Sequence, residues 1–412
     1  MGVGKTVDPY HYSSVKSVTY SKAAVASAHP LASAVGVAIM KEGGNAFDAM
    51  IATQLTLAVV YPGAGNIGGG GFLIARKSDG KLVALDYREM APDKASRDMY
   101  LDKNGNAQNE LSENGHLSSG VPGTVAGLFA TLPYAKLPFK KLIQPAIDLA
   151  EKGFVITAHE ANALNATKAE FLKYSSKTSA FVKDVAWKAG DTLIQPELAA
   201  TLKRIRDNGA KGFYEGETAK YIVEEMQRGK GLITYDDLKN YKAKERTAIE
   251  FDYRDYHVIS FPPPSSGGIL LAQMLKMIEK YPVSSYGFQS AKSVQLMIEA
   301  ERRAYADRAQ HMGDPDYWKV PEKALISDMY LAERMKDYDP NKASVSSGIQ
   351  AGVIHESKET THISIIDAEG NMVAVTTTLN NSYGSKTVVA GAGFIMNDEM
   401  DDFSIKPGVP NM

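Results

Sequence analysis

The pattern of hydrophobic and polar positions predicts a chain built mainly of helices around a few strands. Alanine and aliphatic residues recur at helical spacing in segments bounded by capping residues and glycines. Asn45 stands where an N-cap is needed, and Thr234 with Asp237 three residues on has the pattern of a capping box. The predicted helices are residues 31–40, 46–60, 144–152, 158–174, 196–208, 217–228, 235–241, 269–280 and 294–311, with a further helix after Gly123.

Strands are predicted where β-branched residues alternate between turn residues. The runs 361–366 and 372–378 flank Asp-Ala-Glu-Gly-Asn, in which Gly370 and Asn371 can take positive φ, so this segment predicts a β-hairpin. Residues 247–261 alternate as one strand. Further strands are expected at residues 23–28, 72–75 and 82–87, the last two joined by a turn at Ser78-Asp79-Gly80.

Composition narrows the function classes. With 412 residues, of which 44% are hydrophobic and 23% charged, the chain can bury a large core, and its net charge of -2 gives no electrostatic case for nucleic acid or a membrane surface. The absence of cysteine excludes disulfides, a thiolate nucleophile and zinc–thiolate sites. No apolar run reaches about 18 residues, so no membrane span is predicted. The histidines lack metal-ligand spacing, and we expect no metal or organic cofactor.

Two motifs invite a chemistry that their surroundings do not support. The glycine-rich run 63–71 has no Gly-Lys-Ser/Thr and no Gly-x-Gly-x-x-Gly opening onto a helix, which argues against nucleotide binding. Close backbone packing beside an active site is the better interpretation. Ser265 and Ser266 lack a Gly-x-Ser-x-Gly elbow, so helix capping is expected of them rather than nucleophilic attack.

The start of the hairpin carries the candidate nucleophile. If the chain is cut between Glu359 and Thr360, Thr360 gains an α-amine next to its hydroxyl. An α-amine has a pKa of about 7.7–8.0, so much of it is neutral near pH 7 and can act as the base. His362 is a competing candidate base, but alternation directs its side chain to the face opposite Thr361. The Ser/Gly/Ala-rich residues 340–358 are expected to form an exposed, flexible linker that suits cleavage.

Sequence blocks in order along nearly the whole chain resemble the γ-glutamyltranspeptidases, which are N-terminal nucleophile hydrolases. The blocks are Gly68–Phe72, Asp86–Pro92, Gly120–Thr124, Pro262–Gly268, Arg302–Asp307, Thr360–Asn380 and Asn397–Phe403. The resemblance implies an α/β fold, the four-layer αββα sandwich of the N-terminal nucleophile hydrolases. It also implies a large-chain region, residues 1–359, and the start of the small catalytic chain, residues 360–412.

The activity that the resemblance implies is that of a γ-glutamyltransferase and glutathione hydrolase. Thr360 would first cleave the chain before itself and then attack the γ-carbonyl of a γ-glutamyl compound such as glutathione. Water, an amino acid or a dipeptide would resolve the resulting ester, and the large and small chains of one precursor would stay partners. No nucleic-acid partner is implied, and the family implies a periplasmic or secreted enzyme.

The resemblance also assigns the substrate-binding residues. Thr378 would orient the nucleophile, and Arg88 would hold the donor's α-carboxylate, a task suited to a planar, two-pronged cation. Asn380, Glu399 and Asp402 match positions that hold the donor's α-amino group; Glu399 stands where family members vary between Gln and Glu. A structural ion pair of Arg88 with Glu89 is the competing interpretation, and a structural role is expected for Asp401.

One departure from the family pattern concerns the end of the sequence. The family's Pro-Leu-Ser-Ser-Met serines and later Gly-Gly pair do not occur before Met412, so we expect an incomplete piece that is inactive alone. Loss of one oxyanion donor typically lowers turnover by about 10²–10³. Related enzymes that cleave poly-γ-glutamate or cephalosporin side chains remain alternatives, as does a non-catalytic fragment or homologue.

Overall fold

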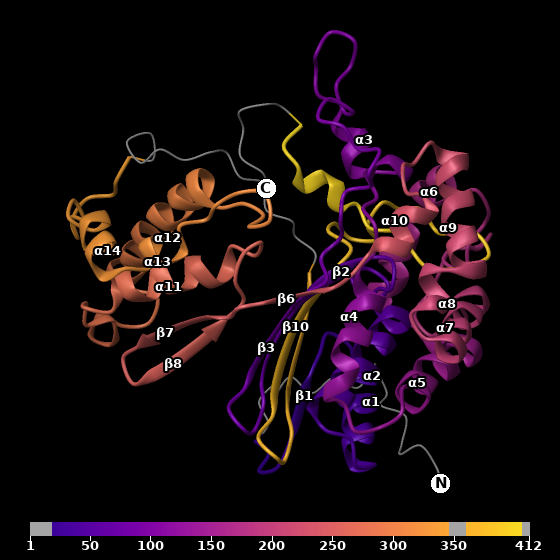
Figure 1. The fold of residues 1–412 in the computed structure, drawn as a ribbon, viewed down its shortest axis with the longest axis horizontal. Coiled ribbons are helices and arrows are strands. Elements are labelled where there is room, and N and C mark those ends of the chain that lie inside the picture. Colours follow the sequence, from indigo (N-terminus) through magenta and orange to yellow (C-terminus); the bar gives the residue numbers. More distant parts are fainter. Residues whose placement is uncertain (1–18, 346–359, 406–412) are drawn as a thin grey trace. The chain divides into compact units, whose positions relative to one another are not determined.

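The computed structural model describes residues 19–345 and 360–405, which form two compact units (Figure 1). The described part of the first unit comprises residues 19–245 and 360–405, and the second comprises residues 246–345. The predicted linker lies mostly in residues 346–359, which fall outside the described residues. Glu359, on the amino-terminal side of the predicted cleavage site, is one of them.

The first unit is organised around a six-stranded sheet with the order β1-β9-β10-β2-β3-β6. The predicted hairpin forms its centre, because β9 pairs antiparallel with both β1 and β10, and β10 pairs antiparallel with β2. Strands from the two ends of the sequence therefore lie side by side (Figure 1). The strands are β1 (Ala24–Ala26), β2 (Gly70–Arg76), β3 (Leu82–Asp86), β6 (Lys244–Arg246), β9 (Thr361–Ile366) and β10 (Met372–Thr378).

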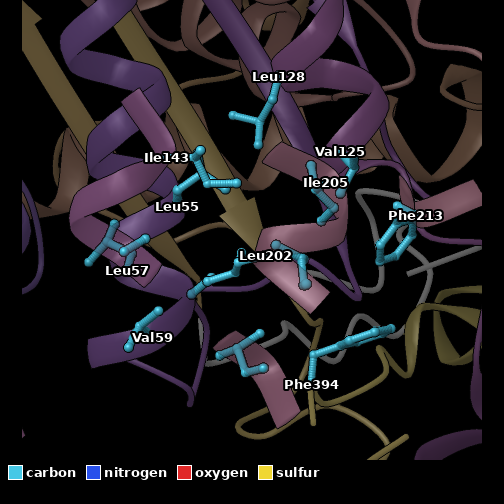
Figure 2. Close-up of a cluster of buried hydrophobic side chains, with 14 of the residues drawn as sticks. Leu55, Leu57, Val59, Val125, Leu128, Ile143, Leu202, Ile205, Phe213 and Phe394 are labelled. Atoms are coloured by element: carbon cyan, nitrogen blue, oxygen red, sulfur yellow. The ribbon is translucent and has the colours of Figure 1, made fainter. Parts of the chain in front are cut away.

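A layer of helices packs against this sheet. Every residue of α2 (Ala46–Val60) is buried, which fits a mostly apolar sequence in which buried polar side chains such as Asp48 and Gln54 are hydrogen-bonded. α2 contacts α1 (Pro30–Lys41), α5 (Phe139–Lys152), β9 and β10, and α5 packs in turn on α7 (Pro196–Asn208). Figure 2 shows the resulting core, in which side chains of α2, α5 and α7 meet. The labelled side chains are Leu55, Leu57, Val59, Val125, Leu128, Ile143, Leu202, Ile205, Phe213 and Phe394.

The strand pattern decides which side chains face the helices. Along β9 burial alternates, with Thr361, Ile363 and Ile365 buried and the residues between them exposed. His362 therefore lies on the face opposite Thr361, as the alternation predicted. Thr360 precedes Thr361 and is exposed, so the candidate nucleophile lies outside the helix-covered core.

The remaining helices of the first unit complete the scaffold. Helices other than α5 lie within a few residues of their predicted bounds, and α5 begins at Phe139 rather than at residue 144. The predicted cap at Asn45 and the predicted capping box of Thr234 with Asp237 both form, and Asn45 also makes a capping box with Asp48. These elements are α3 (Asn109–Glu113), α4 (Thr124–Thr131), α6 (Ala158–Tyr174), α8 (Lys211–Tyr214), α9 (Gly216–Gly229), α10 (Tyr235–Asn240), η1 (His116–Ser118), η2 (Leu132–Tyr134), η5 (Glu399–Asp402) and the strand pair β4 (Phe154–Val155) and β5 (Thr192–Leu193).

The second unit corrects one prediction. Residues 247–261 form two antiparallel strands, β7 (Ile249–Tyr253) and β8 (Tyr256–Ser260), rather than one. The turn between them passes through Arg254, whose φ is +53°, a conformation that arginine adopts less readily than glycine or asparagine. The helices here are η3 (Val283–Tyr286), α11 (Gly267–Ile278), α12 (Ala291–His311), α13 (Glu322–Leu325) and α14 (Asp328–Arg334).

The serines ahead of α11 divide the predicted capping role. The Ser265 hydroxyl accepts a hydrogen bond from Gly267 N at 3.3 Å, as a capping side chain does. Ser266 occupies the N-cap position without a capping bond, and its hydroxyl accepts a hydrogen bond from Arg308 Nε at 3.1 Å. Capping therefore describes Ser265 and not Ser266.

Candidate active site

The strand register brings the predicted nucleophile and the predicted carboxylate-binding arginine to one end of the sheet. Thr361 pairs with Thr377, and Thr378 pairs with Gly70. Gly71 and Tyr87 exchange both backbone hydrogen bonds, at 3.3 and 3.0 Å. Continuing these ladders by one residue places Thr360, Thr378, Gly70 and Arg88 on one row across four neighbouring strands. Side chains on such a row point to the same face of a sheet.

The backbone packs closely along the glycine-rich loop. A Cβ on Gly70 would lie 2.4 Å from Glu89 Oε2 and 2.6 Å from the Tyr87 carbonyl oxygen. A Cβ on Gly69 would lie 2.2 Å from the Thr378 carbonyl oxygen. Only glycine fits at these positions without displacing backbone, which confirms the predicted role of the run in close packing.

Arg88 lies at the centre of a cluster of acidic side chains. One of its guanidinium nitrogens contacts Glu399 Oε1 at 2.5 Å and also pairs with Asp402, both of which η5 carries. Burial opposes the charge of Arg88, but the carboxylates of Glu399 and Asp402 outweigh it and raise the arginine pKa. The structure thus unites three predicted site residues, and the arginine's ion-pair partners are Glu399 and Asp402 rather than Glu89.

The acidic side chains beside Arg88 are incompletely satisfied. Both carboxylate oxygens of Glu89 and Glu399 Oε2 are buried and have no hydrogen-bond partner within the described residues. Burial raises the pKa of Glu399 to about 8, and burial together with the charge of Glu399 raises the pKa of Glu89 well above its ordinary value. Hydrogen-bond donors or a cation would complete this cluster. In the sequence, nothing marks Glu89 as a site residue except its position next to Arg88.

Asn380 lies in a turn with positive φ, and both its backbone and its side chain are hydrogen-bonded. Its φ is +79°, and its side-chain Nδ2 donates to the Asp398 carbonyl oxygen at 3.1 Å. Its backbone N donates to the Thr378 hydroxyl at 3.0 Å. Thr378 therefore links the end of β10 to the Asn380 turn. The predicted hydrogen bond between the Thr378 and Thr360 hydroxyls stays a prediction.

The other candidates have structural partners. Asp401 accepts a hydrogen bond from the Ser112 hydroxyl at 2.5 Å, which fits the structural role expected of it. His362 Nδ1 lies 2.9 Å from the Thr376 hydroxyl on the neighbouring strand. In residues 19–345 and 360–405, no group of three or more His, Asp or Glu side chains is placed to hold a metal ion. None of the helices in these same ranges is long and apolar enough to cross a membrane.

Comparison with known proteins decides which family this geometry belongs to. The sequence model of the family described as Gamma-glutamyltranspeptidase matches residues 32–412. The chain belongs to the γ-glutamyltranspeptidase family. A glutathione hydrolase proenzyme of Escherichia coli (strain K12) is 48% identical over 393 residues, which is 94% of this chain and 68% of that protein.

Solved structures of relatives agree with the fold. The γ-glutamyltranspeptidase of Helicobacter pylori superposes with a TM-score of 0.78 at 43% identity, over 84% of this chain and 100% of that chain. A cephalosporin acylase from Bacillus halodurans superposes with a TM-score of 0.84 at 27% identity, over 98% of this chain and 75% of that chain. These neighbours confirm the predicted α/β fold class of the N-terminal nucleophile hydrolases. The prediction of a γ-glutamyltransferase and glutathione hydrolase is confirmed at the level of the family.

Proposed function

We propose that this γ-glutamyltranspeptidase family member hydrolyses and transfers the γ-glutamyl group of compounds such as glutathione, with Thr360 as the nucleophile. One observation carries the proposal: the strand register puts Thr360 on the same row as Arg88, whose guanidinium lies among acidic side chains. The proposed nucleophile and the proposed carboxylate-binding arginine thus face the same side of the sheet, with β10 and β2 between their strands.

Maturation comes first in this scheme. The Thr360 hydroxyl attacks the Glu359 carbonyl carbon, the peptide bond to Thr360 N breaks, and an ester joins the two residues. Water then hydrolyses the ester, which leaves a carboxylate on Glu359 and a free α-amine on Thr360. Because an α-amine titrates near pH 8, the new terminus can accept the proton of its own hydroxyl at neutral pH.

Donor binding follows from the charges around Arg88. The arginine would bind the donor's α-carboxylate, while Glu399, Asp402 and the Asn380 side chain would bind its ammonium group. Without a donor, the arginine's contacts go to Glu399 and Asp402 themselves, and several carboxyl groups share one guanidinium. A zwitterion supplies one further charge of each sign, so it can enter this arrangement without leaving either charge unpaired.

The chemical step uses the same hydroxyl twice. The Thr360 oxygen attacks the donor's γ-carbonyl carbon, its proton passes to the α-amine, and the donor's amine leaves with that proton. The γ-glutamyl ester on Thr360 is then attacked by water or by the amine of an amino acid or dipeptide. The first acceptor gives hydrolysis, and the second gives transpeptidation.

The test is the fate of the chain in the protein expressed from its complete coding sequence. Denaturing electrophoresis should show two chains, and N-terminal sequencing of the smaller should read Thr-Thr-His-Ile. A Thr360→Ala variant should stay in one piece and fail to hydrolyse glutathione. A small chain that begins at another residue, or a Thr360→Ala variant that still cleaves itself, would overturn the proposal.

A second candidate has one observation in its favour. The cephalosporin acylase superposes over 98% of this chain, so a related acylase activity fits the same fold. The cluster of Arg88, Glu399 and Asp402 instead favours a donor that carries both an ammonium and a carboxylate. Parallel measurement of kcat/KM for glutathione, poly-γ-glutamate and a glutaryl cephalosporin decides between them, and a higher value for either alternative donor would replace the proposal.

By family resemblance we place the enzyme in the periplasm or outside the cell. Fractionation of the native producing cells, followed by immunodetection of the small chain, tests this assignment. Recovery of the chain with the cytoplasmic fraction would contradict it.

A further inference from the structure

One buried asparagine is the hydrogen-bonding centre of the candidate site. Asn66 lies in the loop between α2 and β2 and is 4% exposed. Its Nδ2 donates to the Thr378 carbonyl oxygen at 2.8 Å, to the Thr377 hydroxyl at 3.2 Å and to the Ala64 carbonyl oxygen at 2.9 Å. An asparagine amide has two N–H donors, so this donating capacity is fully used.

The acceptor side of the same amide binds two other elements. Asn66 Oδ1 accepts from Gly69 N at 3.0 Å and from the Thr124 hydroxyl at 2.7 Å. Gly69 belongs to the glycine-rich loop, and Thr124 is the first residue of α4. One side chain therefore joins the end of β10, the glycine-rich loop and the start of a helix.

The atom that Asn66 holds most directly belongs to the strand end beside the nucleophile. Thr378 is the last residue of β10, and the register makes it the cross-strand neighbour of Thr360. The packing leaves the strand end little room to move, because a Cβ on Gly69 would already lie 2.2 Å from the Thr378 carbonyl oxygen. A change in the Asn66 amide is thus transmitted to Thr378 rather than absorbed by the loop.

We propose that Asn66 is a positioning residue, which fixes Thr378 and through it the position of the Thr360 hydroxyl, while touching neither the substrate nor the reacting atoms. The inference rests on the proposed role of Thr360 as nucleophile. The residues proposed to bind the donor are positioned by other contacts. The Tyr241 hydroxyl donates to the Arg88 carbonyl oxygen, and Glu399 N donates to Asn397 Oδ1. Asn66 should therefore govern the rate of reaction more than donor affinity.

The same hairpin offers a matched control at its other end. Asn371 is also 4% exposed, and its side chain is likewise bonded on both sides, to Asp367 Oδ2 at 2.7 Å and to Ser78 N at 2.9 Å. It lies at the β9–β10 turn, remote from Thr378 along both strands. A substitution there removes buried hydrogen bonds of the same kind without reaching the catalytic end.

The test compares Asn66→Asp with Asn371→Ala in the protein expressed from its complete coding sequence. Aspartate keeps the size and the acceptor atom of Asn66 but places an oxygen against the Thr378 carbonyl. We expect kcat for a γ-glutamyl donor to fall by about 10²-fold, as misplacement of a reacting group does. KM should stay within about threefold, and self-cleavage should slow. Asn371→Ala should lower Tm while kcat stays within about threefold of the native value.

A second pair keeps the proposal testable if Asn66→Asp does not fold. Thr124→Val removes the hydroxyl that donates to Asn66 Oδ1, and we expect kcat to fall by about tenfold; Thr124→Ser keeps the hydroxyl and should restore it. The proposal is overturned if Asn66→Asp, or Thr124→Val in its place, keeps native kcat, or if Asn371→Ala loses as much. Thr360→Ala serves as reference: if it stays active, the proposed nucleophile is wrong, whereas an inactive Thr360→Ala beside a fully active Asn66→Asp rejects only the positioning role.

Discussion

Buried carboxyl groups lie at both ends of the β9–β10 hairpin, but they are fully hydrogen-bonded at only one of them. At the turn, the Asp367 carboxylate accepts hydrogen bonds from Ala46 N at 2.9 Å and from Asn371 Nδ2 at 2.7 Å, and it also accepts from the backbone of Glu369 and Asn371. Burial opposes ionisation of Asp367, but these donors outweigh it and lower its pKa. The turn end therefore stabilises the fold.

At the open end, carboxyl groups are buried without enough donors. Glu89 and Glu399 have pKa values raised by burial, and Arg88 is the cation that faces Glu399. Such groups cost folding free energy and are completed only by an additional cation or donor. The turn end holds the hairpin to α2, whereas the open end lies beside buried carboxyl groups that lack hydrogen-bond partners within the described residues.

The largest expected effect is at the open end, on the nucleophile itself. Thr360→Ala should lower γ-glutamyl hydrolysis by about 10³-fold or more, because it removes the oxygen that we propose attacks the γ-carbonyl carbon. Thr360→Ser is the matched control, since it keeps a hydroxyl beside the α-amine and should cleave itself and turn over. Initial rates with a chromogenic γ-glutamyl amide measure both. An alanine variant with native rates would show that the open end of the hairpin does not carry the nucleophile.

A smaller loss is expected from Arg88→Lys. Lysine keeps the charge but loses the planar fork that binds a carboxylate at two points, so kcat/KM should fall by about 10²-fold. Arg97→Lys is a suitable control, because Arg97 forms an exposed ion pair with Asp98. Steady-state kinetics on both variants give the comparison, and equal losses would show that the effect is not specific to the site.

At the turn end the expected change is in stability rather than activity. Asp367→Asn should lower the free energy of unfolding by about 1–3 kcal/mol, because it weakens a fully bonded buried carboxylate. Since the pKa of Asp367 is lowered on folding, its stabilisation is present above the unfolded pKa and is lost as pH falls through the folded value. The difference in unfolding free energy between native and variant proteins, measured by urea unfolding, should therefore be larger at pH 7 than at pH 3.

Asp79→Asn, at the exposed β2–β3 turn, is the control for Asp367→Asn. Its free energy of unfolding should change little at either pH, because the Asp79 side chain is exposed. If Asp367→Asn folded with native stability but lost turnover, the division of labour between the two hairpin ends would be wrong.

The smallest expected effect is the pH dependence contributed by Glu399. Its pKa is raised to about 8, so the folded state binds an extra proton between the unfolded pKa and pH 8, and stability falls as pH rises through that window. Glu399→Gln removes this dependence, so its stability relative to the native protein should increase as pH rises from 5 to 8. Thermal unfolding of both proteins between pH 5 and pH 8 measures this difference in stability. If the native protein became more stable relative to the variant as pH rises, the raised pKa of Glu399 would be contradicted.

What the sequence predicted well was decided locally. The hairpin around Gly370, the cap at Asn45 and the capping box at Thr234 depend on residues within a few positions of each other, and all three form. The hairpin at residues 249–260 was missed because both strands share one alternation and Arg254 gives no turn signal.

The arrangement of the site depends on contacts between distant segments. Family resemblance named Arg88, Glu399 and Asp402, but their pairing follows from strands and a loop more than 300 positions apart in sequence. Asn66 was not singled out, because a single polar residue in a glycine-rich loop has no periodicity to mark it. Its role emerges only where the loop, β10 and α4 meet.

The most direct test of the central claim is peptide mapping by mass spectrometry after reaction with a γ-glutamyl analogue that carries an electrophilic carbon. The protein expressed from its complete coding sequence should carry a single adduct on a peptide whose first residue is Thr360, and excess glutathione should protect against labelling. An adduct on another side chain, such as His362 or Ser265, or a labelled Thr360 still joined to Glu359, would contradict the account.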